Sequence, residues 1–182
     1  MTNFKNKNYS NRGIGLEKII NNANVIYQNK QSAIVIKIPT PTKILYKNCN
    51  GYRLPIKAFY SEKSWLDYIG IANGVPVTFD AKETTNKTSF PLNNVKEHQI
   101  RAMQLWNNCK GISFLIVWWK QLNEFYLLPY EILIEAWEKS KRGERKSIPY
   151  EQFKKEAIPI NYKVYLDWLT AYNIYRSVPD EN

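Results

Sequence analysis

A chain of 182 residues is long enough to bury one substantial core, and it leaves little room for a second independent domain. Its 26 basic residues outnumber its 16 acidic residues, and the formal net charge of +10 favours a polyanionic partner such as nucleic acid. Because membrane-associated and ribosome-associated proteins are also basic, charge alone does not decide between these classes.

The cysteines and the apolar runs indicate the compartment. Cys49 and Cys109 have neither the spacing of a zinc site nor that of a disulfide framework, as is usual in a reducing compartment. The longest apolar run, Ile112–Trp119, is far too short to span a membrane. The sequence therefore predicts a cytoplasmic protein with no membrane partner. We also expect a single domain over residues 1–182, with flexible polar tails at 1–10 and 176–182.

The first predicted elements are a helix and a strand. Apolar residues from Leu16 to Tyr27 recur at helical spacing, which predicts an amphipathic helix over Gly15–Asn29. The run Ala33–Ile38 is rich in Ile and Val and ends at a pair of prolines, which predicts a strand covered on both faces. Residues 42–63 then combine lysines with aromatic residues at poor periodicity, and they predict an inserted basic arm.

The segment Asp67–Lys82 predicts a β-hairpin whose register can be counted. Asn73 and Gly74 lie between two β-rich runs, and this dipeptide favours a two-residue type I′ turn. With that turn, Asp67 faces Asp80 as a non-hydrogen-bonded pair, where Cα atoms approach to about 4.5 Å. Two facing carboxylates repel each other, so this arrangement requires a proton or a cation.

A hard divalent metal satisfies this requirement. Mg²⁺ prefers oxygen ligands and is often held by one or two carboxylates, with water and substrate phosphate completing its shell; Mn²⁺ is its expected substitute. Lys82 lies two residues beyond Asp80, on the same strand face, where its ammonium could reach a metal-bound water or a scissile phosphate. Although a short Asp-x-Lys alone is common by chance, the hairpin register makes phosphodiester hydrolysis the predicted reaction.

A second helix is predicted before Gly111, with one polar residue on its apolar face. That residue is Gln99, whose amide needs a partner. It either supplies an oxygen to the metal or hydrogen-bonds a buried backbone group. The stripe consists of Val95, Gln99, Ala102, Met103 and Trp106.

The remainder of the chain predicts two strands, a helix and a last amphipathic segment. The strands are Ile112–Trp119 and Phe125–Leu128, and a helix follows from Pro129. Residues Lys139–Lys146 are basic and serve either as a soluble helix end or as a phosphate-binding patch. A last amphipathic segment, Val164–Ile174, offers Val164, Trp168 and Leu169 for packing.

Some residues allow two interpretations. Glu17 lies beside the apolar stripe of the first helix and is either a further acid of the site or a solvated helix residue. The tryptophans Trp118, Trp119 and Trp137 are predicted to belong to the core rather than to stack on nucleic-acid bases.

Four motifs together resemble the RecU-type Holliday junction resolvases, in the same order and over the chain to about Asn161. They are NRGIGLEKIIN at Asn11–Asn21, KIPTP at Lys37–Pro41, FDAKETTNKTSFPLNN at Phe79–Asn94 with HQI following, and RKSIPY at Arg145–Tyr150.

This resemblance implies a restriction-endonuclease-like α/β fold of the PD-(D/E)xK class, with a mixed central sheet flanked by helices. It also implies a homodimer that nicks two strands of a four-way DNA junction symmetrically, in recombination and repair. The family's metal-binding acids fall on Asp67 and Asp80, its metal-site glutamine on Gln99, its catalytic lysine on Lys82 and its first-helix glutamate on Glu17.

Residues 42–63 correspond to the family's protruding stalk, which enters the centre of the junction. A RecA-type recombinase is a candidate further partner. The candidate DNA contacts are Arg12, Lys43, Arg53, Lys57, Arg145 and Lys146.

The chain departs from the family pattern at two positions. Asp80 stands where the family commonly has Glu, and its shorter side chain draws a metal nearer the backbone. Trp65 stands where the family has Thr, which removes a ligand oxygen. Beside the resolvase hypothesis, two alternatives therefore stay open: a junction-binding architectural protein with impaired chemistry, and a restriction-type nuclease that cuts linear duplex.

Overall fold

The computed structural model describes residues 15–39, 42–60 and 65–177. The elements, in chain order, are α1 (Leu16–Asn29), β1 (Ala33–Lys37), β2 (Thr42–Cys49), β3 (Tyr52–Tyr60), β4 (Tyr68–Ala72), β5 (Val75–Thr84), β6 (Ser89–Pro91), the short 3-10 helix η1 (Leu92–Asn94), α2 (Glu97–Asn108), β7 (Ile112–Trp119), β8 (Glu124–Pro129), α3 (Tyr130–Lys141), β9 (Ser147–Pro149), α4 (Tyr150–Glu156), β10 (Ile158–Ile160) and α5 (Trp168–Ser177).

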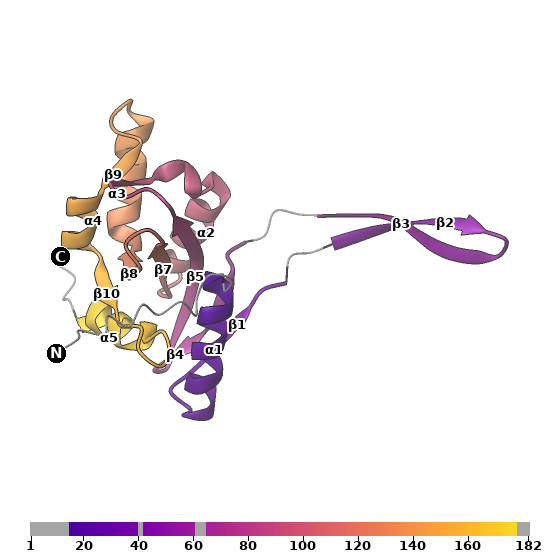
Figure 1. Ribbon diagram of the computed structural model, residues 1–182, viewed down its shortest axis with the longest axis horizontal. Helices are drawn as coiled ribbons and strands as arrows, with labels where there is room; N and C mark the ends of the chain where they lie inside the picture. The colour runs from indigo at the N-terminus through magenta and orange to yellow at the C-terminus, as the bar shows by residue number, and fades with distance from the viewer. Residues whose placement is uncertain (1–14, 40–41, 61–64, 178–182) are drawn as a thin grey trace, which may run out of the picture.

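A mixed sheet forms the centre of the molecule (Figure 1). Its strand order is β1-β4-β5-β7-β8-β10, and every neighbouring pair is antiparallel except β5 and β7. That parallel pair needs a crossover connection, which β6, η1 and α2 supply. The predicted α/β fold class, a mixed sheet flanked by helices, is confirmed.

The β4–β5 hairpin has the register counted from its turn. Ala72 pairs with Val75 and Ile71 pairs with Pro76. Asn73 and Gly74 have φ angles of 48° and 78°, the positive values that a type I′ turn requires at both central positions. The local turn chemistry therefore fixes which side chains face each other across this hairpin.

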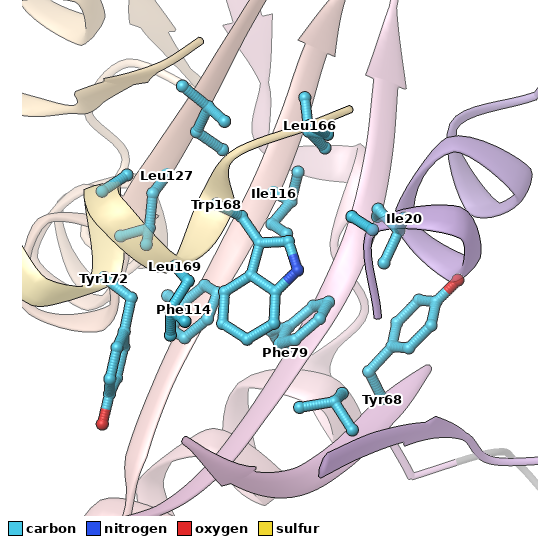
Figure 2. Close-up of a cluster of buried hydrophobic side chains, with 14 of the residues drawn as sticks. Ile20, Tyr68, Phe79, Phe114, Ile116, Leu127, Leu166, Trp168, Leu169 and Tyr172 are labelled. Atoms are coloured by element: carbon cyan, nitrogen blue, oxygen red, sulfur yellow. The ribbon is translucent and has the colours of Figure 1, made fainter. Parts of the chain in front are cut away.

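Helices cover both faces of the sheet. On one face, α1 and α5 pack over a cluster centred on Phe79, whose ring stacks on Phe114 at 4.9 Å and lies beside Trp168 (Figure 2). On the other face, α2, α3 and α4 pack over Leu115, Val117 and Trp119. As predicted, Trp118 and Trp119 are buried, while Trp137 is half-buried against the second cluster.

The inserted arm contains a regular two-stranded ribbon, which we call the stalk (residues 42–60). Strands β2 and β3 pair from Thr42↔Tyr60 to Cys49↔Tyr52 with a bulge after Leu45, and the ribbon extends away from the body (Figure 1). The sequence did not predict strands here because a ribbon exposed on both faces has no need to alternate apolar and polar residues. Residues 61–63 of the predicted arm lie outside the described residues.

The edge strand β1 differs from its prediction. Among the described residues, α1 covers one face of β1, and Ile34 and Ile36 on the other face are each 60% exposed. Close backbone contact joins β1 to β4, since a Cβ added at Gly70 would lie 2.0 Å from the Ile34 carbonyl oxygen. Ile38 N–H donates to the Asp67 carbonyl at 2.8 Å and closes the base of the stalk.

The C-terminal segment also differs in detail. Helix α5 begins at Trp168, and Trp168 and Leu169 are buried as predicted, but Val164 is 90% exposed and does not pack. Helix α5 extends through Ser177, so the first two residues of the predicted tail at 176–182 are helical. Residues 178–182 and the predicted tail at 1–10 lie outside the described residues. No helix in the described part of the chain is long and apolar enough to cross a membrane.

Candidate active site

The site residues come from a hairpin and the helix that covers it. Asp67 directly precedes β4, Asp80 and Lys82 lie on β5, and Gln99 lies in the first turn of α2. Asp80 and Lys82 pair with β7 residues that belong to the cluster beneath α2. The four side chains therefore meet on the α2 side of the sheet.

The two aspartates are held by each other's strand. The backbone N–H of Asp67 donates to Oδ1 of Asp80 at 3.1 Å, and the backbone N–H of Ala81 donates to Oδ2 of Asp67 at 3.1 Å. The Asp80 side chain is fully buried, whereas Asp67 is half-buried. The juxtaposition expected from the hairpin register is present, and the backbone hydrogen bonds fix the orientation of both carboxylates.

Lys82 and Gln99 complete a closed set of contacts around Asp80. The Lys82 ammonium forms an ion pair with Oδ2 of Asp80 and donates to Oε1 of Gln99 at 3.1 Å. The Gln99 amide nitrogen donates to the same Oδ2 at 3.1 Å. Because the Lys82 side chain is only 15% exposed, this ion pair lies largely out of water. Its geometry positions the ammonium beside the carboxylates.

Burial dominates the electrostatics of Asp80. Loss of hydration raises the pKa of Asp80 to about 7, although the Lys82 ammonium lowers it; the negative charge of Asp67 raises it further. The positive charge of Lys82 therefore does not compensate for the hydration that the ionised Asp80 carboxylate loses on burial. A divalent cation would favour the ionised form of Asp80 more strongly than Lys82 does.

The donor set fits a hard metal ion. Asp67 and Asp80 offer four carboxylate oxygens, which suit Mg²⁺ or Mn²⁺, and the site lacks the thiolate and imidazole ligands typical of zinc. In the described residues, no group of three or more His, Cys, Asp or Glu side chains could hold a metal. Mg²⁺ suits such a sparse set because it keeps several waters and takes further ligands from substrate phosphate.

Gln99 does not present its oxygen to the carboxylates. Its Oε1 accepts from Lys82 and from the backbone N–H of Lys96 at 3.0 Å, while its amide nitrogen faces Asp80. In this arrangement Gln99 joins Asp80 to Lys82. Coordination of a metal through Oε1 would require the amide to turn over and give up these bonds, so its role as a ligand stays a prediction.

Glu17 lies apart from this set. Its carboxylate forms an ion pair with Lys37 of β1, and its backbone carbonyl accepts from the Tyr68 hydroxyl at 3.2 Å. Helix α1 covers the face of the sheet opposite α2. The structure therefore does not bring the Glu17 carboxylate into contact with Asp67 or Asp80. Lys37, the ion-pair partner of Glu17, is the only charged residue in the predicted strand Ala33–Ile38.

Sequence reasoning missed Glu83. Its carboxylate accepts from the first backbone N–H of α1, at Leu16, at 2.8 Å and from the Lys120 ammonium at 2.9 Å. Burial raises the pKa of Glu83, but these two hydrogen bonds outweigh it and the pKa is lowered overall. Neighbouring residues of a strand point to opposite faces of the sheet, so Glu83, which directly follows Lys82, points to the α1 side. This position was the sequence signal from which its contact with α1 could have been predicted.

The candidate DNA contacts lie in two places. Arg53 and Lys57 are exposed on the stalk, and the Arg53 guanidinium lies over the Tyr46 ring at 4.8 Å. Arg145 and Lys146 are exposed directly before β9, where Nε of Arg145 donates to Ser147 at 3.4 Å. For Lys43 the structure describes only its place in β2, and Arg12 lies outside the described residues.

Comparison with known proteins gives concordant matches across most of the chain. The family model described as Recombination protein U matches residues 11–174. A protein of Oenococcus oeni named Holliday junction resolvase RecU is 39% identical over 92% of this chain and 88% of its own length. A Staphylococcus aureus protein of the same name is 39% identical over 92% of this chain and 83% of its own length.

One solved structure shows a weaker similarity. It is that of Archaeoglobus fulgidus Hjc, a Holliday junction resolvase from an archaeal hyperthermophile. It covers 63% of this chain and 77% of that chain at 8% identity, with a TM-score of 0.39.

Proposed function

Because the chain belongs to the Recombination protein U family, we propose that it is an endonuclease that resolves four-way DNA junctions in recombination and repair. The observation that carries this proposal is the buried Asp80 carboxylate, held against Asp67 on one side and the Lys82 ammonium on the other. Two carboxylates and a lysine at one point of a basic protein suit hydrolysis of a phosphodiester.

In this mechanism, Asp67 and Asp80 hold Mg²⁺, which supplies a more acidic water and Lewis-acid polarisation of the scissile phosphate when bound. Their orientation is fixed beforehand by the hydrogen bonds from the neighbouring backbone. Lys82 stabilises the negative charge that develops on the phosphoryl oxygens, since its ammonium is already held beside the carboxylates by Gln99. Gln99 acts as a positioning residue for Lys82, or as a metal ligand if its amide turns over.

Symmetric cleavage of two strands requires two sites, and we propose that a second copy of the chain supplies the other one. The proposed interface is an apolar patch on the uncovered face of β1 and β4. Ile34 pairs with Ile71 across these strands, and Ile34, Ile36 and Ile71 are 54–60% exposed. The stalk emerges between these same strands.

The dimer proposal is tested by the association state. Ile34→Glu or Ile71→Glu should convert the protein from dimer to monomer in analytical ultracentrifugation. Ile174→Glu on α5, where the parent side chain is 49% exposed, is the matched control and should leave the association state unchanged. A monomeric parent protein, or a dimer that tolerates both charged variants, would exclude this interface.

DNA contacts are proposed on both basic regions. Arg53 and Lys57 of the stalk meet the centre of the junction, and Arg145 and Lys146 meet the phosphates of an arm. Arg12 and Lys43 remain proposed contacts from the family resemblance alone. We place the activity in the cytoplasm, with a RecA-type recombinase as the further partner to be tested by co-purification.

The decisive experiment compares a synthetic four-way junction with its linear duplex in Mg²⁺. The parent protein should cut the junction at symmetric positions and leave the duplex intact, whereas Asp80→Asn should bind the junction without cutting it. Mn²⁺ should replace Mg²⁺. Equal cutting of both DNAs would favour a restriction-type nuclease. Binding without cleavage by the parent protein would instead favour an architectural role, which the change at Trp65 keeps open.

A further inference from the structure

Trp65 is an exposed aromatic residue beside the candidate active site. Its side chain is 52% exposed, whereas the other five tryptophans, all in the described part of the chain, are buried or half-buried. Tryptophan is highly buried on average in folded proteins. Because single exposed apolar residues are common, this exposure gains significance only from where Trp65 lies.

The backbone next to Trp65 is firmly anchored. Leu66 is fully buried in the cluster beneath α2, and the carbonyl of Asp67 accepts the hydrogen bond from Ile38 at 2.8 Å. Two residues span at most about 7 Å, so the Cα atom of Trp65 lies within this distance of that of Asp67. The Trp65 backbone is therefore held close to the carboxylate pair, and Trp65 remains 52% exposed to solvent.

The indole is also available for an external partner. No described residue stacks on it or forms a hydrogen bond with it. Trp65 follows the stalk in the chain, since β3 ends at Tyr60. Trp65 thus lies in the chain between the ribbon expected to meet the junction centre and the carboxylates expected to meet the scissile phosphate.

We propose that Trp65 stacks on a nucleobase at the branch point, close to the scissile phosphate. This inference rests on the proposed function. Aromatic stacking tolerates any base because every base has a π-face. Trp65 therefore favours branched over linear DNA without reading sequence, because duplex bases are covered by their neighbours.

The test measures binding on the Asp80→Asn background, so that cleavage does not interfere. Four-way junctions carry 2-aminopurine at each of the two nucleotides flanking the branch point. Trp65→Ala should weaken junction binding about tenfold and linear-duplex binding less than about twofold, the size expected for one lost stacking contact. Trp65→Phe should retain most of the affinity. Proteins with the parent Trp65 or with Trp65→Phe should change the 2-aminopurine fluorescence, whereas Trp65→Ala should not.

Ile174→Ala is the matched control, because it also shortens an exposed apolar side chain, on α5 over the opposite face, and it should change neither measurement. Thermal unfolding checks that each variant folds. Equal losses on junction and duplex, or unchanged fluorescence with Trp65 present, would overturn the stacking proposal. Neither the binding measurement nor the fluorescence measurement requires catalysis. A parent protein that binds junctions without cutting them would therefore refute the proposed activity, while these two measurements would still decide the stacking proposal.

Discussion

Replacing Asp80 by asparagine should stabilise the protein at about pH 8 when no divalent cation is present. The parent carboxylate is fully buried, and its pKa of about 7 compares with an ordinary value of 3.8. Each pKa unit corresponds to about 1.4 kcal/mol, so a difference of about 3 between the two values sets an upper limit of about 4 kcal/mol. We expect a gain of about 2 to 4 kcal/mol, because local relaxation reduces the cost of the buried charge.

The sign follows from proton binding. Between the unfolded pKa of 3.8 and the folded pKa of about 7, the native protein keeps the Asp80 proton that the unfolded chain releases. The free energy of unfolding of the parent therefore falls as pH rises through this window and levels off above it. The asparagine side chain of the Asp80→Asn variant does not titrate, so the stability difference between variant and parent should grow from about pH 4 to about pH 8.

Urea unfolding of both proteins in EDTA, across this pH range, measures the effect. Glu97→Gln is the control, because it removes a carboxylate whose side chain is 80% exposed, and it should change the free energy of unfolding far less than Asp80→Asn does. Parallel curves for the parent and Asp80→Asn would refute the argument from burial. Added Mg²⁺ at about 100 times its Kd should stabilise the parent by about 2.7 kcal/mol and the variant far less.

Three further predictions concern other parts of the structure. Lys82→Met leaves Asp80 buried without its cation, so the carboxyl should take up a proton at about pH 8. Because the Asp80 pKa in the parent is about 7, one pKa unit away, the loss in urea unfolding should be at most about 1.4 kcal/mol. Junction cleavage should fall at least about a hundredfold, and retained cleavage would contradict the role of Lys82. Gly70→Ala places a Cβ against the Ile34 carbonyl, so we expect a loss of about 3 kcal/mol in the same assay, and a stable variant would contradict the tight β1–β4 contact. Removing Arg53 and Lys57 together should weaken junction binding more than duplex binding and reduce the salt slope by about 2; equal losses would count against a junction-reading stalk.

The part of the site that could be predicted from sequence is the part fixed by local chemistry. Asn73 and Gly74 set a turn whose register placed Asp67 opposite Asp80, and strand alternation then placed Lys82 on the same face. Each of these inferences depends only on residues that lie close together in the sequence. The position of Glu17 depends on which face of the sheet α1 covers, and helical periodicity gives no information about that choice.

Side-chain orientation and the exposure of strands could also not be predicted from the sequence. The position of Gln99 was expected at the site, but which of its amide atoms faces Asp80 depends on the neighbouring Lys96 backbone and Lys82. Strand β1 was predicted to be covered on both faces because Ile34 and Ile36 lie in an apolar run. Such a run does not distinguish burial within one chain from burial by a second copy. The strands β6, β9 and β10 are three residues long, too short for a recognisable alternation.

The closed base of the stalk has a consequence for how far the stalk can vary in length. The Lys37↔Tyr68 pair and the Ile38–Asp67 hydrogen bond bring the two ends of the insertion together independently of what lies between them. Loop-closure entropy rises only slowly with length, by about 0.6 kcal/mol for each doubling. The ribbon can therefore be lengthened, shortened or exchanged as a module, while the hydrogen bonds between Asp67 and β5 stay in place.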